Sequence, residues 1–248
     1  MKVLCVIPAR YSSTRLPGKP LKDIQGMPMI CRVYDRAAQA KRIEKVVVAT
    51  DDERILAAVE EHGGKAMMTA KDHPTGTDRL AEAAAAFPDM ELVINVQGDE
   101  PLIDPEVIDE LAAAFEGEED LNMATVMTEI KDEAEQRNPN NVKVVTDARG
   151  YALYFSRSLM PYPRKTGFSP VYKHIGIYAY KRDFLLRYAK MEPTPLEQSE
   201  SLEQLRVLEN GYRIKVIKTD RQFVGVDTEE DLKRVNELYR KLEGEASI

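Results

Sequence analysis

Three long basic side chains follow the first apolar segment of the chain. Residues 3–8 form a short apolar run, and the loop after it, PARYSSTRLPGKP, carries Arg10, Arg15, Lys19, several hydroxyl groups and a Pro-Gly turn. Exposed backbone N–H groups and basic side chains of such a loop can hold phosphate oxygens. The loop matches neither the P-loop pattern G-x-x-x-x-G-K-[ST] nor the G-x-G-x-x-G pattern of dinucleotide oxidoreductases. It predicts a triphosphate site, and an ordinary surface loop stays open as the alternative.

Acidic side chains follow two later segments that are also apolar. Asp99 comes directly after the run ELVINV, and a carboxylate beside phosphates needs a bridging cation, so Asp99 is the first choice for a Mg²⁺ ligand. Glu100 is the second choice, although a role in the local turn fits it better. Asp227 lies in the stretch GVDTEE, where Asp227 and Glu230 have the spacing of a capping box for the terminal helix. From spacing alone, capping is favoured over metal binding at Asp227.

The stretch KDHPTGTDR (71–79) follows the third apolar run. Thr77 or Asp78 could cap the next helix, and the Thr-Gly-Thr segment leaves backbone groups that could read the edge of a base. His73 is interpreted as a loop histidine, because the sequence offers it no partner. This loop is therefore a second candidate for contact with a nucleotide.

A further polar set lies in the second half of the chain. Arg157 follows a predicted β-hairpin, and its forked guanidinium suits a carboxylate. His174 and Tyr178 are four residues apart in a predicted strand, so they face the same side. Glu203 and Gln204 lie on a predicted helix that could be simply amphipathic. Each of these residues also has an ordinary structural explanation.

The first half of the chain alternates between strand and helix patterns. Because ligands bind beyond the carboxyl ends of parallel strands, this alternation predicts an edge where the candidate loops meet. It predicts a mostly parallel twisted sheet flanked by helices. The predicted strands are 3–8, 44–50, 65–69, 91–96 and 121–128, and the predicted helices are 28–40, 52–62, 78–87 and 104–115.

The pattern changes after about residue 138. There the sequence predicts a hairpin around an Asp-Ala-Arg-Gly turn, a strand over 173–180, a helix over 199–210 and a last helix from about Thr228. No repeat or low-complexity linker marks a boundary. We therefore expect a single α/β domain, residues 1–248, with a smaller mixed α/β lobe at about 138–200.

Composition excludes several classes of protein. The chain has 248 residues, 43% of them hydrophobic, and a formal net charge of −7, which argues against a non-specific nucleic-acid binder. No stretch approaches the ~20 uninterrupted apolar residues of a membrane span. Pro8 and Arg10 end the first apolar run too early for a signal peptide, so we expect a cytoplasmic protein.

The cysteines and histidines do not form a metal-binding pattern. Cys5 and Cys31 lie in apolar contexts and are expected to be reduced core residues. The three histidines are scattered, and no Cys/His spacing indicates zinc. Any catalytic metal would therefore be a hard cation held by oxygen.

Together, the motifs resemble those of one family, the CMP-Kdo synthetases, or 3-deoxy-manno-octulosonate cytidylyltransferases. The combination of YFSR, H-x-G-x-Y and LEQLR is specific to that family, whereas R-x₄-R-L-P-G-K is shared more loosely with other sugar nucleotidyltransferases. The matching stretches keep the family order and cover nearly the whole chain. They are 7–21, 46–52, 73–83, 94–101, 138–145, 151–157, 173–180, 202–211 and 225–232.

The resemblance implies a fold like that of the nucleotide-diphospho-sugar transferases and a Mg²⁺-dependent homodimer. It also implies that the smaller lobe at about 138–200 serves sugar binding and dimerisation. The implied reaction joins CTP and 3-deoxy-D-manno-octulosonate (Kdo) to give CMP-Kdo for lipopolysaccharide biosynthesis, with release of pyrophosphate. The implied nucleotide contacts are Ala9, Arg10, Arg15, Lys19, Lys71, Thr75, Gly76 and Arg79. The implied metal ligands are Asp99 and Asp227, which act in catalysis with Arg10, Arg15 and Lys19. The implied sugar contacts are Gln97, Arg157, His174, Tyr178, Glu203 and Gln204.

Three alternatives stay open at this point. A cytidylyltransferase for another acid sugar, such as a sialic acid, would share the first loop and differ in the sugar contacts. A glycosyltransferase would normally carry an Asp-x-Asp motif after the fourth strand, which QGDEP lacks. A non-catalytic nucleotide-binding regulator would bind CTP without turnover.

Overall fold

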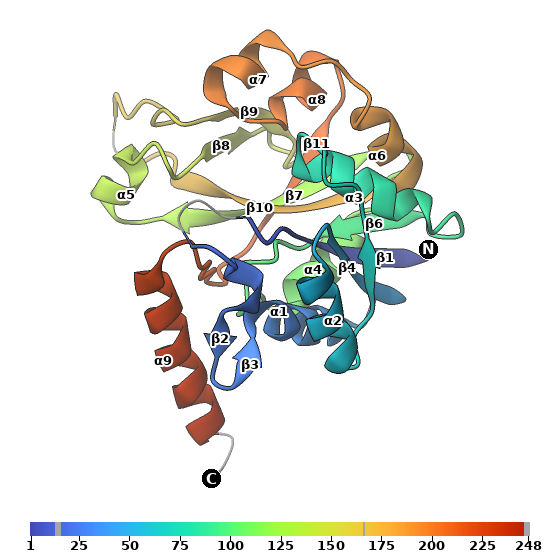
Figure 1. Cartoon of the computed structure of the whole chain (residues 1–248). Helices are drawn as coiled ribbons and strands as arrows, with labels where there is room; N and C mark the ends of the chain where they lie inside the picture. Colours follow the sequence, from blue (N-terminus) through green and yellow to red (C-terminus); the bar gives the residue numbers. More distant parts are fainter. Residues whose placement is uncertain (13–15, 166, 246–248) are drawn as a thin grey trace. The chain divides into compact units, whose positions relative to one another are not determined.

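The computed structural model describes residues 1–12, 16–165 and 167–245 and contains two compact units. Unit 1 consists of Met1–Asp109 with Phe223–Ile248, and unit 2 consists of Glu110–Gln222; both can be followed by colour in Figure 1. Unit 2 is longer than the lobe expected at 138–200. The single domain of residues 1–248 stays a prediction.

Unit 1 is built on parallel strands in the order β5–β4–β1–β6. Most residues of the central strands are buried, because helices cover both faces and leave no side for polar residues. The register places Cys5 of β1 opposite Val46 and Ile94. The strands are β1 (Val3–Ala9), β4 (Lys45–Thr50), β5 (Ala66–Met68) and β6 (Leu92–Asn95).

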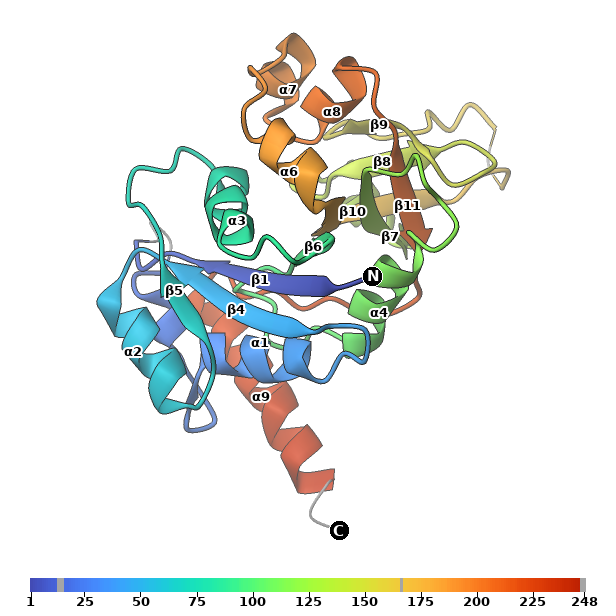
Figure 2. The same ribbon diagram turned by 90° about the vertical axis from the view of Figure 1, so that its right-hand side faces the viewer.

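Helices lie on both faces of this sheet. Helices α1 (Met29–Ala38) and α2 (Glu53–Glu61) lie on one face, and α3 (Gly76–Ala85) lies on the other, as Figure 2 shows. Helix α4 (Pro105–Ala113) follows β6 in the chain. The fold class predicted from the alternating pattern is confirmed, and the strands and helices predicted for unit 1 match within a few residues.

The segment that follows β1 and the last helix of the chain pack together in unit 1. A short 3₁₀ helix η1 (Lys19–Leu21) leads into a hairpin of β2 (Asp23–Ile24) and β3 (Met27–Pro28), and helix α9 (Glu229–Glu245) packs against this region. Neither η1 nor this hairpin was predicted from the sequence. The shared apolar cluster consists of Leu16, Ile24, Met29, Val226, Leu232, Val235 and Tyr239.

Unit 2 has a mixed sheet in the order β11–β7–β10–β8–β9. Among the described strands of this unit, β11 pairs with β7 in parallel, whereas β7 with β10, β10 with β8, and β8 with β9 are antiparallel pairs. The predicted hairpin is confirmed as β8 and β9, with Gly150 at a φ of +79° in its turn. The strands are β7 (Met123–Ile130), β8 (Lys143–Thr146), β9 (Ala152–Ser156), β10 (Val171–Lys181) and β11 (Ile214–Lys218).

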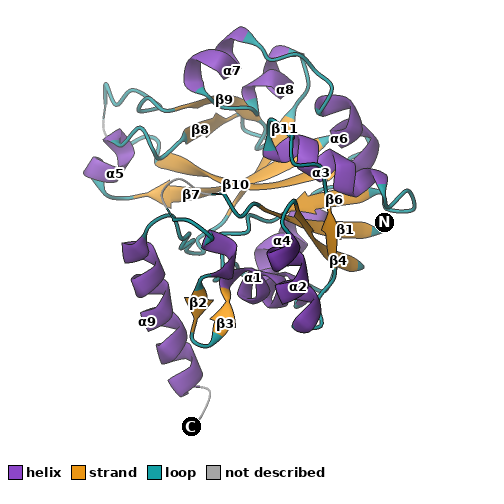
Figure 3. Cartoon of the chain, in the orientation of Figure 1, coloured by secondary structure: helices purple, strands orange, loops and turns teal. Residues whose placement is uncertain are grey.

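Short helices accompany these strands (Figure 3). They are α5 (Glu133–Arg137), α6 (Arg182–Tyr188), α7 (Pro195–Glu200) and α8 (Leu205–Glu209). The predicted helix over 199–210 is wrong, because Ser201 has a φ of 52° and ends α7 in a left-handed turn. Glu203 and Gln204 therefore lie in the turn between α7 and α8.

Two expectations from composition can be compared with the structure. Cys5 and Cys31 are both buried free thiols, as predicted. Within the described ranges, no helix combines the length and the apolar character that crossing a membrane requires.

His174 of β10 is a buried polar group in the sheet of unit 2, with an exposed fraction of 8%. Its Nε2 lies 2.9 Å from the Thr125 hydroxyl, which also lies 3.1 Å and 2.8 Å from the carbonyl oxygens of Ile175 and Ile177. A hydroxyl donates one hydrogen and carbonyls only accept, so Nε2–H donates to the hydroxyl and Nδ1 is left as an acceptor. Burial lowers the pKa of His174 to about 3, so the ring is neutral near pH 7.

The burial of neutral His174 should make the free energy of unfolding depend on pH. The unfolded histidine takes up its proton near pH 6.5 and the folded one only near pH 3. The unfolded state therefore binds more protons between these values, and stability falls as the pH falls below 6.5. This group should remove about 2 kcal/mol between pH 7 and pH 5. Urea denaturation at both pH values should show that His174→Gln lacks this part of the loss.

Thr125→Ser is the matched control for this measurement, because it keeps the hydroxyl that accepts from Nε2. It should keep the pH dependence of the unsubstituted protein. An H174Q variant that loses as much stability as the unsubstituted protein would show that another group causes the dependence.

Candidate functional site

Unit 1 contains a pocket of about 360 Å³ at the carboxyl ends of β1 and β6. It combines the first loop of the chain, the QGD segment and Asp227, which lies two residues before the last helix. Six of the predicted site residues line it. Its lining is Pro8, Ala9, Arg10, Ser12, Lys19, Pro20, Gln97, Gly98, Asp99 and Asp227.

Lys19 enters this pocket from the first turn of η1. Gly18 precedes it with a φ of +65°, a left-handed conformation that a residue with a Cβ rarely adopts. The Gly18 N–H donates to the carbonyl of Tyr11 at 3.2 Å, which closes the loop after β1. The Pro-Gly turn recognised in the sequence therefore places the Lys19 side chain in the pocket. Arg15, also predicted for this site, lies outside the described residues.

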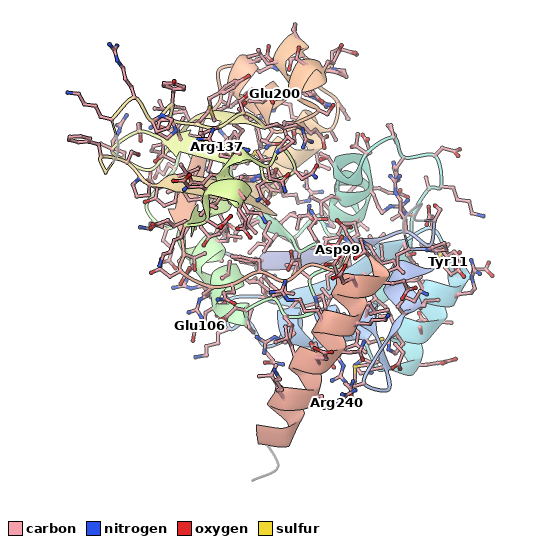
Figure 4. All side chains as sticks on the ribbon, turned by 90° about the vertical axis from the view of Figure 1, so that its left-hand side faces the viewer. Tyr11, Asp99, Glu106, Arg137, Glu200 and Arg240 are labelled. Atoms are coloured by element: carbon pink, nitrogen blue, oxygen red, sulfur yellow. The ribbon has the colours of Figure 1, made fainter. Side chains whose placement is uncertain are left out.

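Asp99 is held close to β1 by the glycine before it. A Cβ on Gly98 would lie 2.9 Å from the carbonyl oxygen of Pro8, so only glycine allows this approach. The carbonyl of Asp99 accepts from the N–H of Val226 at 2.9 Å. That bond joins the segment after β6 to the segment before α9, and Figure 4 labels Asp99 beside the start of that helix.

Asp227 precedes α9, but it does not form the predicted capping pair with Glu230. The reciprocal pair is Thr228 and Asp231: the Asp231 N–H donates to the Thr228 hydroxyl oxygen at 3.2 Å, and the Asp231 carboxylate accepts from the Thr228 N–H at 2.9 Å. The capping box therefore lies one residue later than the sequence suggested. The carboxylate of Asp227 turns instead to Lys19.

Lys19 Nζ lies between two carboxylates that are far apart in the sequence. It donates to Asp99 Oδ2 at 2.6 Å and to Asp227 Oδ1 at 3.1 Å. Burial opposes the charge of the ammonium, yet the two carboxylates outweigh it, and the pKa of Lys19 is raised. The convergence of Asp99 and Asp227, on which the predicted reaction centre depends, is present within unit 1.

These two carboxylates are the strongest candidates for holding a hard cation. Both contact one positive group, so the point where they meet already suits a cation. Over residues 1–12, 16–165 and 167–245, no cluster of three or more His, Cys, Asp or Glu side chains could hold a metal ion. A divalent cation here would take its other ligands from a bound phosphate or from water.

Arg10 joins the pocket to the loop after β5. Its Nη2 donates to the carbonyls of His73 at 2.8 Å and Thr75 at 3.2 Å. Thr75 caps α3 through a reciprocal pair with Asp78, and Gly76 is the first residue of that helix. Arg10, the first of the three basic side chains in the loop after β1, thus lies against the loop that was expected to read a base.

Two other predicted nucleotide contacts, Lys71 and Arg79, are not among the residues that line this pocket. Lys71 is exposed and lines a separate hollow with Asp51 and Arg54. Arg79 is fully buried, where its guanidinium donates to Asp51 at 2.9 Å and to the hydroxyl of Thr69. Its side chain holds α3 against the segments after β4 and β5, and a nucleotide contact by Arg79 stays a prediction.

The predicted sugar contacts other than Gln97 all belong to unit 2. Arg157 follows β9, His174 and Tyr178 lie on β10, and Glu203 and Gln204 lie before α8. The strand pairing shifts between Ile175 and Tyr178, and this bulge brings the His174 and Tyr178 rings to 5.3 Å between centroids. Burial, and then the charge of Glu203, raise the pKa of the Tyr178 phenol.

Sequence reasoning missed two charged residues of unit 2 that contact Arg157. Lys143 Nζ donates to its carbonyl, and Glu200 accepts from its backbone N–H. A lysine inside the apolar run VKVV was the available signal for Lys143. Nothing in the local sequence marks Glu200, because its partners are distant in the chain.

Comparison with known proteins identifies the family. The sequence matches the family model described as cytidylyltransferase over residues 4–217. The 3-deoxy-manno-octulosonate cytidylyltransferase of Fusobacterium nucleatum is 55% identical over 235 residues, which are 95% of this chain and 96% of the relative. The enzyme of the same name from Geotalea uraniireducens is 53% identical over 252 residues, covering 97% of this chain and 100% of the relative.

Solved structures agree with the sequence matches. The structure of CMP:2-keto-3-deoxy-manno-octonic acid synthetase complexed with CTP has a TM-score of 0.93 and 46% identity, covering 97% of this chain and 99% of that one. A 4-diphosphocytidyl-2C-methyl-D-erythritol synthase from Anaerococcus prevotii is only 16% identical, with a TM-score of 0.63 over 96% of each chain, and shares the fold alone. This chain belongs to the cytidylyltransferase family and, within it, to the 3-deoxy-manno-octulosonate cytidylyltransferases.

Proposed function

We propose that this protein transfers CMP from CTP to Kdo and releases pyrophosphate. The anomeric hydroxyl of Kdo attacks the α-phosphorus of CTP in line, the bond to the bridging oxygen breaks, and pyrophosphate and the hydroxyl proton leave. No protein nucleophile is required, so the protein contributes positioning and charge. The alternatives of a glycosyltransferase and a non-catalytic regulator lose their support, because the relatives are named as cytidylyltransferases over nearly their whole length.

The observation that carries this proposal is the meeting of Lys19, Asp99 and Asp227 in one pocket. Two carboxylates and basic side chains at the end of a parallel sheet suit a triphosphate that arrives with a divalent cation. Arg10 and Lys19 would neutralise the charge that develops on the leaving pyrophosphate, and Arg15 would join them.

Asp99 and Asp227 are the proposed ligands of Mg²⁺. When bound, Mg²⁺ supplies positive charge to the phosphate oxygens and lowers the pKa of the attacking hydroxyl. Lys19 would then exchange its carboxylate partners for phosphate oxygens. Before the cation binds, the ammonium of Lys19 would offset the repulsion between the two carboxylates and hold them close together.

Unit 2 would supply most of the contacts to the acid sugar. Arg157 would pair with the carboxylate of Kdo, and neutral His174 would offer Nδ1 as an acceptor to a hydroxyl. Tyr178, Glu203 and Gln204 would bind other hydroxyls. The predicted sugar contact of Gln97 stays a prediction. A homodimer, expected from the family resemblance, and a cytoplasmic location, expected from composition, belong to the same proposal.

Replacing Asp99 by asparagine should slow turnover strongly. The amide keeps the size of the side chain but removes the charge that would hold Mg²⁺, so kcat should fall by at least ~10²-fold, the scale of a lost electrostatic stabiliser. The measurement is pyrophosphate release with saturating CTP, Kdo and Mg²⁺.

Glu229→Gln is the matched control, because it also turns an acid into its amide close to Asp227. Glu229 is exposed and pairs with Lys22 at 3.0 Å, and its variant should keep kcat within about two-fold. Unchanged turnover of D99N at saturating Mg²⁺ would remove Asp99 from the mechanism.

Replacing Arg157 by alanine should weaken binding of the sugar and spare the nucleotide. The KM for Kdo should rise by at least about ten-fold, because a charge-assisted hydrogen bond is lost, while the KM for CTP stays within about two-fold. Arg149→Ala removes an exposed arginine from the hairpin turn before β9 and should change neither constant. An equal rise in the KM for CTP would place Arg157 in the fold or in the nucleotide site instead.

A further inference from the structure

The guanidinium of Arg157 is held by neutral acceptors. Its Nε donates to the carbonyl of Glu200 at 2.7 Å, its Nη1 to the carbonyl of Pro139 at 3.1 Å and its Nη2 to the carbonyl of Ser201 at 3.4 Å. These bonds fix the plane of the guanidinium. Among the described residues, all its hydrogen-bond acceptors are carbonyls, so its positive charge has no carboxylate bound to it.

The carboxylate of Glu200 binds the backbone N–H of Arg157 and a neighbouring hydroxyl rather than the guanidinium of Arg157. Oε2 accepts from the Arg157 N–H at 2.9 Å, and Oε1 accepts from the hydroxyl of Ser156 at 2.6 Å. The Ser156 oxygen in turn accepts from the Ser158 N–H at 3.0 Å. Glu200, labelled in Figure 4, thus fixes the end of β9 against the end of α7.

Lys143 holds the other side of the same junction. Its side chain is fully buried, and Nζ donates to the carbonyls of Asn138 at 3.0 Å, Asn141 at 2.5 Å and Arg157 at 2.5 Å. Three donors of an ammonium therefore meet three acceptors. Burial lowers the pKa of Lys143, the charge of Glu200 opposes that shift, and the charge of Arg157 adds to it.

The three charged residues leave one positive charge in excess. Lys143 and Arg157 are cations and Glu200 is an anion, and the anion binds backbone and hydroxyl groups of β9 instead of either cation. A junction that served only to hold the chain together would gain by pairing Glu200 with the guanidinium, because charge-assisted pairs are the stronger hydrogen bonds. In the observed arrangement, hydrogen bonds to carbonyls fix the Arg157 guanidinium, and no carboxylate among the described residues must be displaced before the guanidinium binds an anion.

We propose that Glu200 and Lys143 are positioning residues that fix Arg157 for the carboxylate of the acid sugar. This role rests on the proposed function, because it takes Arg157 as the residue that pairs with that carboxylate. Glu200 holds the backbone of Arg157 by accepting from its N–H, and Lys143 holds it by donating to its carbonyl. The same junction holds the turn that carries Glu203 and Gln204, since that turn begins directly after Glu200.

Steady-state kinetics of Glu200→Ala and Glu200→Gln test this role. The alanine variant loses the hydrogen bonds from the Ser156 hydroxyl and the Arg157 N–H. Its KM for Kdo should therefore rise by about ten-fold or more, with the KM for CTP within about two-fold of the unsubstituted enzyme. The glutamine variant should stay within about two-fold in both constants, because its amide can accept from the Arg157 N–H and donate to Ser156. Lys143→Met should raise the KM for Kdo as the alanine variant does.

Glu197→Ala is the matched control on the same helix. Glu197 pairs with Arg206 at 2.7 Å and has no bond to Arg157 among the described residues. Its loss should lower the melting temperature at least as much as E200A does and leave the KM for Kdo within about two-fold. An equal rise in that KM for E197A would show general loosening of unit 2 and overturn the proposal.

Three other results would also overturn it. They are an unchanged KM for Kdo in E200A, an equal rise in the KM for CTP, and an E200Q variant as impaired as E200A. If E200A fails to fold, Ser156→Ala removes one of the same two hydrogen bonds and must still raise the KM for Kdo selectively. Failure of the unsubstituted enzyme to release pyrophosphate with Kdo would instead contradict the proposed function itself.

Discussion

The structure of unit 1 depends on one ammonium group between two carboxylates. Asp99 and Asp227 are brought together by distant parts of the chain, and without a cation their charges would repel each other. Lys19 provides that cation at 2.6 Å and 3.1 Å from the two oxygens. Lys19 therefore occupies the position between the two carboxylates where the proposed mechanism would place a divalent cation. This explains why a basic side chain from the first loop belongs among the acids.

Much of unit 1 could be predicted from the sequence because its signals are local. Apolar runs separated by helical patterns specify a parallel sheet, and ligands bind beyond the carboxyl ends of its strands. That rule alone placed Arg10, Lys19 and Asp99 at one edge. The position of Asp227 followed only from the resemblance, since its place depends on how α9 packs onto Leu16 and Ile24 near the start of the chain.

The features that sequence reasoning missed depend on contacts between distant residues. The helix predicted over 199–210 is broken by the left-handed Ser201, a residue type that gives no warning of such a turn. The capping pair of α9 is Thr228 with Asp231, and two overlapping acidic patterns made a shift of one residue invisible. Glu200 reaches Ser156 and Arg157, more than forty residues away in the chain, as the separations of 44 and 43 positions show.

Lys19 in unit 1 and Arg157 in unit 2 are bound by acceptors of different charge, and this difference suits the two cations to different ligands. In unit 1 the cation Lys19 is bound by acids. In the proposed mechanism it would exchange them for phosphate oxygens, while a divalent cation would take its place between the acids. In unit 2 the cation Arg157 is held by carbonyls, so no internal carboxylate must be displaced before another can bind. Exchange suits a triphosphate that carries its own counter-ion, and an unneutralised guanidinium suits a sugar acid that carries none.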